Sequence, residues 1–503
     1  MSRGGEEPPE GYLGASARIR RGPAPEMVRA GYQLEIDDAP LLHRGLALSH
    51  LAHVLCLAEG EALPDLDRHA LLRALIELAE TAPEDFPYDP LYGDAYNSQE
   101  RWLEGRIGPA AGWLPAGRPR REAGRIAFRI ALRARVLDAL AAVARFAQAL
   151  ARGADRHADV VMADYTYLQA AQPTTFGHYL LSFCYPALRD GERLKEAHEW
   201  TDRSPGGAGG VAGTRYPIAR ERVAELLGFG GVIEHTRDAM WQTDGLVSLL
   251  NACSLAAVNA SRLAEDLEIY SSDEFSLVRL SDEFCRASAL MPQKRNPYAL
   301  VVIRGGAGTL IGRATGLMAT QRTPSARTDN LLYAYGEVCS AVEMTTGLLD
   351  LAAGVADGLE PQVETMATSA LESFAQAGDL VEAISLATGR DYRSCYRAVG
   401  RAVAEALDQG LGPSSLDAEA IERAAQATLN SSLEVPDEVI ATALDPASAI
   451  AGRLQPVEPL AERCRIEAEE LEAWARNRRA HAEAAESALL EAARRLGSSP
   501  SGR

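Results

Sequence analysis

The stretch that decides the fold is RASALMPQKRNPYALVVIR, which runs from Arg286 to Arg304. It places a hydroxyl, Ser288, ahead of two prolines, Pro292 and Pro297, and closes in an apolar run. Because proline disfavours helix at the residue before it, the segment between Ser288 and Pro297 is predicted to be an irregular loop between two helices. Such a loop can aim a base and a cation at one point, but its composition alone fits a plain helix–loop–helix connection equally well.

The order of residues in this loop resembles the signature of the aspartase/fumarase superfamily, Gly-Ser-Ser-x-Met-Pro-x-Lys-x-Asn, and is most similar to the form in argininosuccinate lyases. Ser288 stands for the first serine, while Ala287 and Ala289 replace its two neighbours. The resemblance implies that Ser288 is the catalytic base that removes a proton next to a carboxylate. It also implies that Lys294 in the same loop is catalytic and that Met291 and Asn296 bind substrate.

Length and charge limit the range of functions. With 503 residues, the chain can form two or three domains. Hydrophobic residues make up 47% and charged residues 24%, as in ordinary soluble globular proteins. The net charge of −19 argues against a nucleic-acid partner, because no basic surplus is present to neutralise phosphates. An anionic substrate would therefore need a locally positive pocket.

Cysteine, histidine and the N-terminus bear on compartment and cofactors. The seven cysteines are scattered and form no CxxC pair, which is typical of reduced thiols in the cytoplasm. The nine histidines show neither HExxH nor HxH spacing, so we expect no metal or other cofactor. The N-terminus has no apolar signal region, and no apolar run is expected to reach membrane-spanning length. We therefore expect a cytoplasmic protein with no membrane partner.

Helical periodicity dominates the chain. Residues 126–151 lack glycine and proline and repeat apolar residues at helical spacing, so they predict a helix of roughly 39 Å. No segment shows convincing strand alternation. With abundant alanine and leucine, this predicts an all-α fold. Further long helices are expected at 39–80 (interrupted near Pro64), 246–280 (with one break), 333–356 and 460–496.

The resemblance to argininosuccinate lyases covers most of the chain. It implies a three-domain fold with a central bundle of long helices, aspartase/fumarase (argininosuccinate lyase)-like. Residues 1–122 would form an N-terminal helical domain that begins with an extended arm rich in Gly, Pro and charge. Residues 123–368 would form the central bundle carrying the signature loop, and residues 369–503 a C-terminal helical domain. The resemblance also implies a homotetramer whose active sites are each built from three subunits.

Three arginines crowd the segment Gly117–Arg121, which reads GRPRR. A solvated basic turn would explain this composition. The segment also resembles the Gly-Arg-Ser-Arg-Asn-Asp loop of argininosuccinate lyases, which implies that Arg118, Arg120 and Arg121 bind a substrate carboxylate. The planar guanidinium fork suits that task. Arg121 replaces an asparagine, so it adds a positive charge, and the family's substrate pose need not transfer.

Residues 164–190 resemble the Gly-Tyr-Thr-His-Leu-Gln…Gln-Pro-x-Thr-Phe-Gly-His run of the same lyases. Thr166 and Gln169 match and are expected to bind substrate. Tyr167 replaces the family's active-site histidine, and Val301 replaces the glutamate that pairs with it. Losing both avoids stranding a buried charge, which would cost about 3–5 kcal/mol. Our hypothesis is that Tyr167 donates the leaving-group proton, unless the leaving nitrogen needs little protonation.

Three further segments bear on the substrate. The Gly-rich stretch 204–214 is not a phosphate loop, because no GK[ST] follows it and no strand is expected before it. Thr243 stands where the family has an arginine. In residues 323–336, none of the Tyr, Gln and Lys side chains that hold substrate in argininosuccinate lyases is clearly retained. These losses argue against argininosuccinate itself as the substrate.

The predicted function is that of an argininosuccinate-lyase-like carbon–nitrogen lyase. It would eliminate an amine-type nitrogen compound from an N-substituted succinate or related dicarboxylate, giving fumarate, or catalyse the reverse, in a specialised biosynthetic pathway. Lys294 and Asn296 would stabilise the dianion-like intermediate, and losing such a donor typically costs about 10²–10³ in rate. One alternative is a catalytically silent structural homologue of the lyases. Another is a cycloisomerase or hydratase of the same superfamily.

Overall fold

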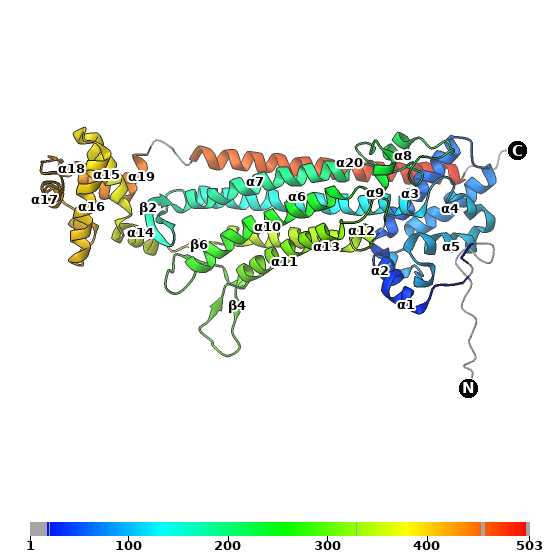
Figure 1. Cartoon of the computed structure of the whole chain (residues 1–503), viewed down its shortest axis with the longest axis horizontal. Coiled ribbons are helices and arrows are strands. Elements are labelled where there is room, and N and C mark those ends of the chain that lie inside the picture. Colours follow the sequence, from blue (N-terminus) through cyan, green and yellow to red (C-terminus); the bar gives the residue numbers. More distant parts are fainter. Residues whose placement is uncertain (1–17, 20, 328, 454–457, 499–503) are drawn as a thin grey trace.

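The computed structural model describes residues 18–19, 21–327, 329–453 and 458–498, and these form an elongated, mainly helical molecule (Figure 1). A bundle of long helices lies in the middle. A group of shorter helices packs at one end, and a second small helical group lies at the other. The predicted all-α fold class is confirmed.

The N-terminal group is helical from Pro25 onward. Its elements are α1 (Pro25–Met27), the π-helix η1 (Val28–Tyr32), α2 (Gln33–Asp37), α3 (Ala39–Glu59), α4 (Asp65–Glu80), α5 (Ala95–Ile107) and the 3₁₀ turns η2 (Pro83–Asp85), η3 (Pro90–Tyr92) and η4 (Gly108–Trp113). The predicted extended arm is therefore wrong after Pro25, because proline is compatible with a first helical turn, where its missing N–H needs no partner. The start of that arm, residues 1–17 and 20, lies outside the described residues. The break predicted near Pro64 is confirmed.

The helix α6 (Arg120–Arg156) is the centre of the bundle, and it extends beyond the predicted range at both ends. It packs against α3, α7, α13 and α20. Small, fully buried side chains such as Ala139, Ala142 and Ala147 let these neighbours approach closely. The other long helices are α7 (Phe176–Thr201), α10 (Asp244–Tyr270), α11 (Tyr298–Thr320), α13 (Tyr335–Asp357) and α20 (Glu458–Ser498).

Shorter elements connect the long helices. They include α8 (Arg220–Leu226), α9 (Thr236–Trp241), α12 (Asp329–Leu332) and the 3₁₀ turn η5 (Asp282–Phe284). The described part of the chain also contains three antiparallel strand pairs, which the sequence did not predict: β1 (Val161–Thr166) with β2 (Gln169–Thr175), β3 (Val278–Arg279) with β6 (Glu360–Pro361), and β4 (Arg286–Ala287) with β5 (Arg295–Asn296). Most of these strands are too short to show the alternation on which a prediction depends. The helix expected to reach residue 280 accordingly ends at Tyr270, and β3 follows it.

The C-terminal group has its own small hydrophobic cluster within residues 374–444. Its elements are α14 (Val363–Glu372), α15 (Ala377–Thr388), α16 (Tyr392–Asp408), α17 (Ala418–Leu429), α18 (Asp437–Leu444), α19 (Pro446–Ala451) and the 3₁₀ turns η6 (Phe374–Gln376) and η7 (Pro413–Ser415). By contrast, α20 runs back along α6 as far as α4 and shares the large core of the bundle. The domain boundaries after residues 122 and 368 stay predictions, but residues 369–503 do not share one core.

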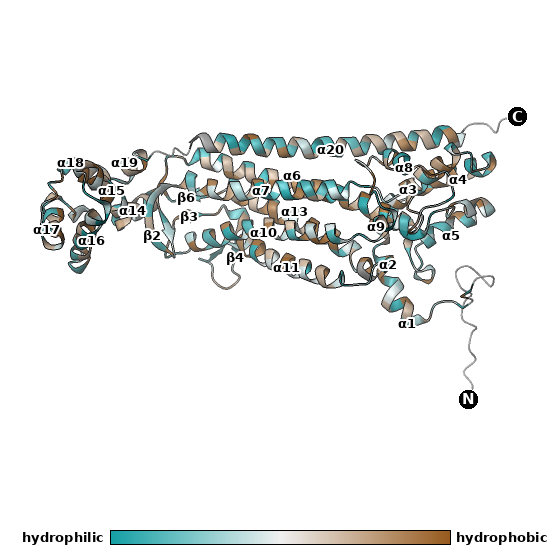
Figure 2. Ribbon diagram, turned by 45° about the horizontal axis from the view of Figure 1, so that its top comes forward, coloured by the Kyte–Doolittle hydropathy of each residue, from teal (hydrophilic) through white to brown (hydrophobic). Residues whose placement is uncertain are grey.

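Three helices, α3, α10 and α13, are long and apolar enough to cross a membrane by length and composition alone. This finding differs from the expectation that no apolar run reaches that length. In their most apolar windows, 83%, 56% and 56% of the residues are buried inside the protein. Figure 2 shows many hydrophobic residues on the helices of the bundle and hydrophilic residues along much of α20. In this structure the apolar residues of the three helices therefore help to build the core.

Candidate active site

The three segments expected to form the active site lie at three separate places of the chain. The signature loop projects from the side of the bundle at β4 (Figure 1). The β1–β2 hairpin lies where the bundle meets the C-terminal group, and the arginine-rich segment lies at the N-terminus of α6, near the other end of the molecule. A single chain therefore does not bring Ser288, Tyr167 and Arg120 together.

Ser288 is held by the backbone of its own loop. Its Oγ accepts hydrogen bonds from the N–H groups of Leu290, at 3.3 Å, and Met291, at 3.1 Å. Donors to a hydroxyl oxygen favour the deprotonated form, which is the form a base requires. The loop therefore gives Ser288 a local source of stabilisation that comes from backbone rather than from a histidine.

The base of the signature loop is closed by the β4–β5 ladder. Asn296, predicted to contact substrate, donates from Nδ2 to the carbonyl oxygen of Arg286 at 2.8 Å and joins the two ends of the loop. Lys294 and Met291 are exposed on the outer part of the loop. Asn296 thus supports the shape of the loop in this chain, whereas Lys294 stays accessible to a molecule arriving from outside.

Tyr167 and Leu168 form the turn between β1 and β2. Both have positive φ, 54° and 58°, and the Tyr167 side chain is fully exposed. Two-residue hairpin turns of this kind favour Asn-Gly, so a tyrosine and a leucine there store about 1–2 kcal/mol each. Backbone strain of this kind clusters at functional sites, and this turn presents the Tyr167 side chain to solvent. The predicted substrate residues Thr166 and Gln169 flank the turn and are also exposed.

The arginines of the arginine-rich segment differ in burial and in their hydrogen-bond partners. Arg118 is 3% exposed, and its guanidinium donates to the Ser49 carbonyl at 2.9 Å, to the Ser49 hydroxyl at 3.0 Å and to His50 Nδ1 at 2.7 Å. These bonds occupy its outer nitrogens in the unliganded chain, so the predicted contact of Arg118 with a substrate carboxylate, which stays a prediction, would compete with them. Arg120 keeps 41% of its side chain exposed and forms an ion pair with Asp94, which also caps the N-terminus of α5. Arg120 is therefore the accessible carboxylate-binding candidate.

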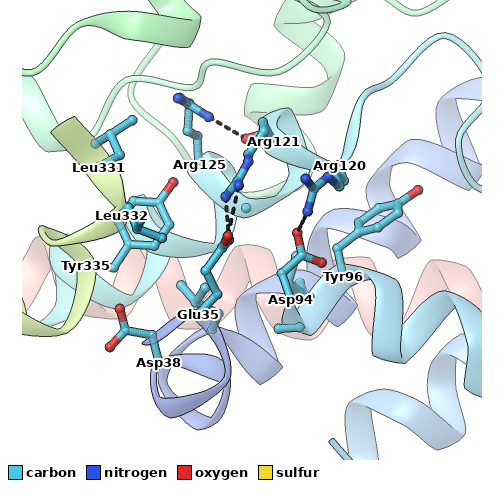
Figure 3. A pocket seen from close by; sticks show the side chains of 14 residues that line it. Glu35, Asp38, Asp94, Tyr96, Arg120, Arg121, Arg125, Leu331, Leu332 and Tyr335 are labelled. Atoms are coloured by element: carbon cyan, nitrogen blue, oxygen red, sulfur yellow. Dashed lines mark hydrogen bonds and ion pairs between the residues drawn. The ribbon is translucent and has the colours of Figure 1, made fainter. Parts of the chain in front are cut away.

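Arg121, the added charge, is neutralised within the chain. It donates from Nη1 and Nη2 to the two carboxylate oxygens of Glu35, at 2.5 and 3.0 Å (Figure 3). The pair lies beside a cavity of about 30 Å³, which has room for about two waters. Among the residues lining that cavity are Asp38, whose carboxylate accepts from the Gly336 N–H at 3.1 Å, and Tyr335. The predicted role of Arg121 in substrate binding therefore competes with an internal carboxylate.

The Gly-rich stretch 204–214 binds a carboxylate of the chain itself. The N–H groups of Gly207 and Gly209 each donate at 2.7 Å to one oxygen of Glu122, which is 2% exposed. Both glycines have positive φ, which aims their N–H groups into one concavity. Burial raises the pKa of Glu122, while Arg118 and the two amides oppose the rise. The loop thus fixes the start of α6 and with it Arg120.

A larger cavity, of about 990 Å³, opens on the other side of Arg120. It brings together the arginine-rich segment and the Gly-rich stretch with parts of the N-terminal group that no motif had indicated. These parts are Arg18, Ile19, Arg21, Gly22, Pro23, Tyr32, Leu91, Tyr92, Gly93, Tyr96, Asn97 and Glu100. The partners Glu35 and Asp94 were also missed. Asp94 lies ahead of a helical run as an N-cap, which was a usable signal, whereas Glu35 has no local signature.

The described ranges contain no group of three or more His, Cys, Asp and Glu side chains that could hold a metal ion.

Comparison with known proteins shows which family the chain resembles. Residues 36–312 match the family described as lyase. The chain is 33% identical to argininosuccinate lyase from Geobacillus thermodenitrificans over 376 residues, which cover 74% of this chain and 82% of that protein.

Two further relatives cover more of the chain. Argininosuccinate lyase from Methanothermobacter thermautotrophicus is 30% identical over 431 residues, 86% of this chain and 92% of that protein. A structure of an EDDS lyase variant with bound fumarate superimposes with a TM-score of 0.83 at 25% identity, covering 94% of this chain and 98% of that one. These likenesses extend well beyond the signature loop.

Proposed function

Because the chain belongs to this lyase family, as an argininosuccinate-lyase-like carbon–nitrogen lyase, we propose that it catalyses the reversible β-elimination of an N-substituted succinate or related dicarboxylate. The products would be fumarate and an amine-type nitrogen compound. The observation that carries the proposal is the signature loop, in which two backbone N–H groups donate to Ser288 Oγ. The departures at Thr243 and in residues 323–336 support a substrate other than argininosuccinate, and hence a specialised biosynthetic role.

In the proposed reaction, Ser288 Oγ takes the proton from the carbon next to a carboxylate. The electron pair of that C–H bond moves into the carboxylate, then forms the double bond as the C–N bond breaks and its electrons leave on nitrogen. Lys294 would stabilise the charge that develops on the carboxylate, and Arg120 would hold the second one. Tyr167 would protonate the departing nitrogen.

The proposal includes a homotetramer in which three subunits share each site, because one chain keeps the three segments apart. The face of α11 supports it. Large apolar side chains on this helix remain between 38% and 52% exposed: Tyr298, Val301, Val302, Ile311 and Met318. A Cβ built on four of its glycines would meet nothing within 4 Å: Gly305, Gly308, Gly312 and Gly316. A smooth apolar face of this kind suits close packing against a second copy.

We also infer a cytoplasmic location, which the seven free cysteines support.

Light scattering tests the proposed tetramer, and four times the monomer mass is expected. Ile311→Glu should dissociate the tetramer and abolish activity together. A wild-type protein that stays monomeric would contradict the shared site.

The activity test incubates the protein with fumarate and a panel of amines and hydrazines, and follows loss of the double bond at 240 nm. Ser288→Ala should abolish turnover, while Ser414→Ala, which removes an exposed serine of the C-terminal group, should leave it unchanged. If the wild-type protein showed no activity with any amine of the panel, the alternative of a catalytically silent homologue would be favoured. Malate as the only product, seen by NMR, would instead identify a hydratase.

A further inference from the structure

A cavity of about 990 Å³ lies beside Arg120. Its volume lies at the upper end of the range of small-molecule sites, roughly 300–1,000 Å³. Arg120 lines both this cavity and the small one behind it, so a ligand carboxylate on Arg120 would leave the rest of the ligand in the larger space. The cavity is thus placed to take what is attached to the succinate part of a substrate.

The walls of this cavity are largely apolar or aromatic. Three tyrosine rings line it, those of Tyr32, Tyr92 and Tyr96. Aliphatic groups complete the walls: Ile19, Pro23, Leu91, Pro115 and Pro119. Such surfaces bind rings and hydrocarbon chains, because tyrosine contributes large contact area and aliphatic groups exclude water. They offer little to a small, strongly hydrated group.

The charge on the cavity walls has one dominant sign. Among the described residues that line the cavity, guanidinium groups come from Arg18, Arg21, Arg118 and Arg120, and one carboxylate comes from Glu100. Arg120 and Arg118 have partners in the chain, but Arg18 and Arg21 form no ion pair with another described residue. A cationic substituent such as a guanidino group would therefore meet repulsion, while a neutral or acidic one would not.

We propose that this cavity receives the nitrogen substituent of the substrate, and that the substituent is a large ring-containing group that is neutral or acidic, not a guanidino chain. This inference rests on the proposed function, since it assumes that an N-substituted succinate is the ligand. Arg18 and Arg21, which line the cavity, then act as specificity-determining residues, and Leu91 on the same wall limits the available space.

Binding tests the inference without turnover. Isothermal titration of the full-length wild-type protein compares N-benzyl-L-aspartate with N-methyl-L-aspartate. The benzyl compound should bind at least about tenfold more tightly, as expected when a hydrophobic pocket gains a ring. Leu91→Trp should remove most of this advantage without changing the affinity for the methyl compound. Leu66→Trp, which enlarges a leucine that is 78% exposed on α4, is the matched control and should change neither.

Turnover adds the charge test. With fumarate as co-substrate and NMR detection, 4-(aminomethyl)benzoate and benzylamine should be added at least about tenfold more efficiently than agmatine. Replacing both Arg18 and Arg21 by glutamate should lower the efficiency with 4-(aminomethyl)benzoate and raise it with agmatine. Arg29→Glu makes a charge change of the same kind at an exposed position outside the cavity walls and should leave the order unchanged.

The two proposals fail differently. Tight binding of N-benzyl-L-aspartate that Leu91→Trp weakens, without addition of any amine, would overturn the lyase function and keep the cavity assignment. Addition of methylamine with equal binding of the two aspartates would keep the lyase function and overturn the assignment. Preference for agmatine over benzylamine would likewise overturn it.

Discussion

Both carboxylate oxygens of Glu35 accept hydrogen bonds from Arg121, a residue 86 positions later in the chain. Glu35 lies on α2 and Arg121 in the first turn of α6, so the pair fastens the N-terminal helices to the start of the bundle. It also cancels the charge that Arg121 introduces in place of the family's asparagine. Arg120 is also paired, with Asp94, but its side chain is 41% exposed against 24% for Arg121, so Arg120 is the more accessible of the two to a substrate carboxylate.

Removing the charge of Glu35 should destabilise the fold. Glu35→Gln leaves Arg121 partly buried without its counterion, and we expect a loss of about 2–3 kcal/mol in the free energy of unfolding, less than for a fully buried pair. Urea denaturation measures the loss. The double variant Glu35→Gln with Arg121→Asn should recover most of it, because no unpaired charge remains. Glu26→Gln, which removes the charge from an exposed pair with Arg29, is the control and should cost little stability. If the Glu35→Gln protein were as stable as the Glu26→Gln protein, the proposed role of the Glu35–Arg121 pair would be wrong.

Replacement by lysine should have different effects at Arg120 and at Arg118. Arg120→Lys keeps the charge but loses the fork, so KM for a dicarboxylate should rise about 10–100-fold with little change in stability. Arg118→Lys cannot make the bonds to Ser49 and His50 and should cost about 3 kcal/mol in the free energy of unfolding. Steady-state kinetics and urea denaturation of both variants separate the roles. If Arg120→Lys and Arg118→Lys changed KM equally and were equally stable, the assignment of substrate binding to Arg120 and of a structural role to Arg118 would be wrong.

Tyr167→Phe should lower kcat by about 10²–10⁴ if the phenol is the general acid. The side chain is fully exposed in the isolated chain, so the unfolding free energy should not change. Tyr396→Phe, on the exposed side of α16, is the matched control. Full turnover of Tyr167→Phe would show that the leaving nitrogen departs without this proton.

Acid should weaken the contact between α7 and α20. Burial lowers the pKa of His198 to about 4, and its ring packs edge-on against Trp474 at 5.2 Å. The unfolded chain binds a proton near the ordinary histidine pKa and the folded chain does not. The stability from the neutral ring is therefore complete above about pH 6.5 and is lost as the pH falls toward 4.

His198→Phe keeps a ring and removes the titration. Between pH 7 and pH 4.5 it should lose about 2 kcal/mol less unfolding free energy than the wild type. Urea denaturation at four pH values measures the difference. Parallel losses in the two proteins would show that His198 does not contribute.

The long helices and the signature loop could be predicted from sequence, because both depend on local patterns. The apolar period of residues 126–151 located α6, and Pro297 marked the start of α11 at Tyr298. The ends of α6 were harder, since its first turn contains Arg120 and Arg121, which looked like part of a loop. A capping signal was absent there, because the residue before the helix is Pro119.

The division of labour among the arginines could not be predicted. His50 and Ser49 lie 68 and 69 positions before Arg118, and no local pattern joins residues so far apart. The hairpin turn gave no signal either, since Tyr167 and Leu168 adopt a conformation for which glycine or asparagine is expected. In both cases tertiary contacts override the local preference.

The path of α20 has a consequence for folding. This last helix returns from the far end of the molecule to cover α6 and reach α4, and it supplies buried side chains such as Cys464, Leu471 and Leu489. Before α20 docks, one side of α6 has no cover. The apolar side chains on that side then stay exposed to solvent, and surface exposed in this way during folding favours aggregation.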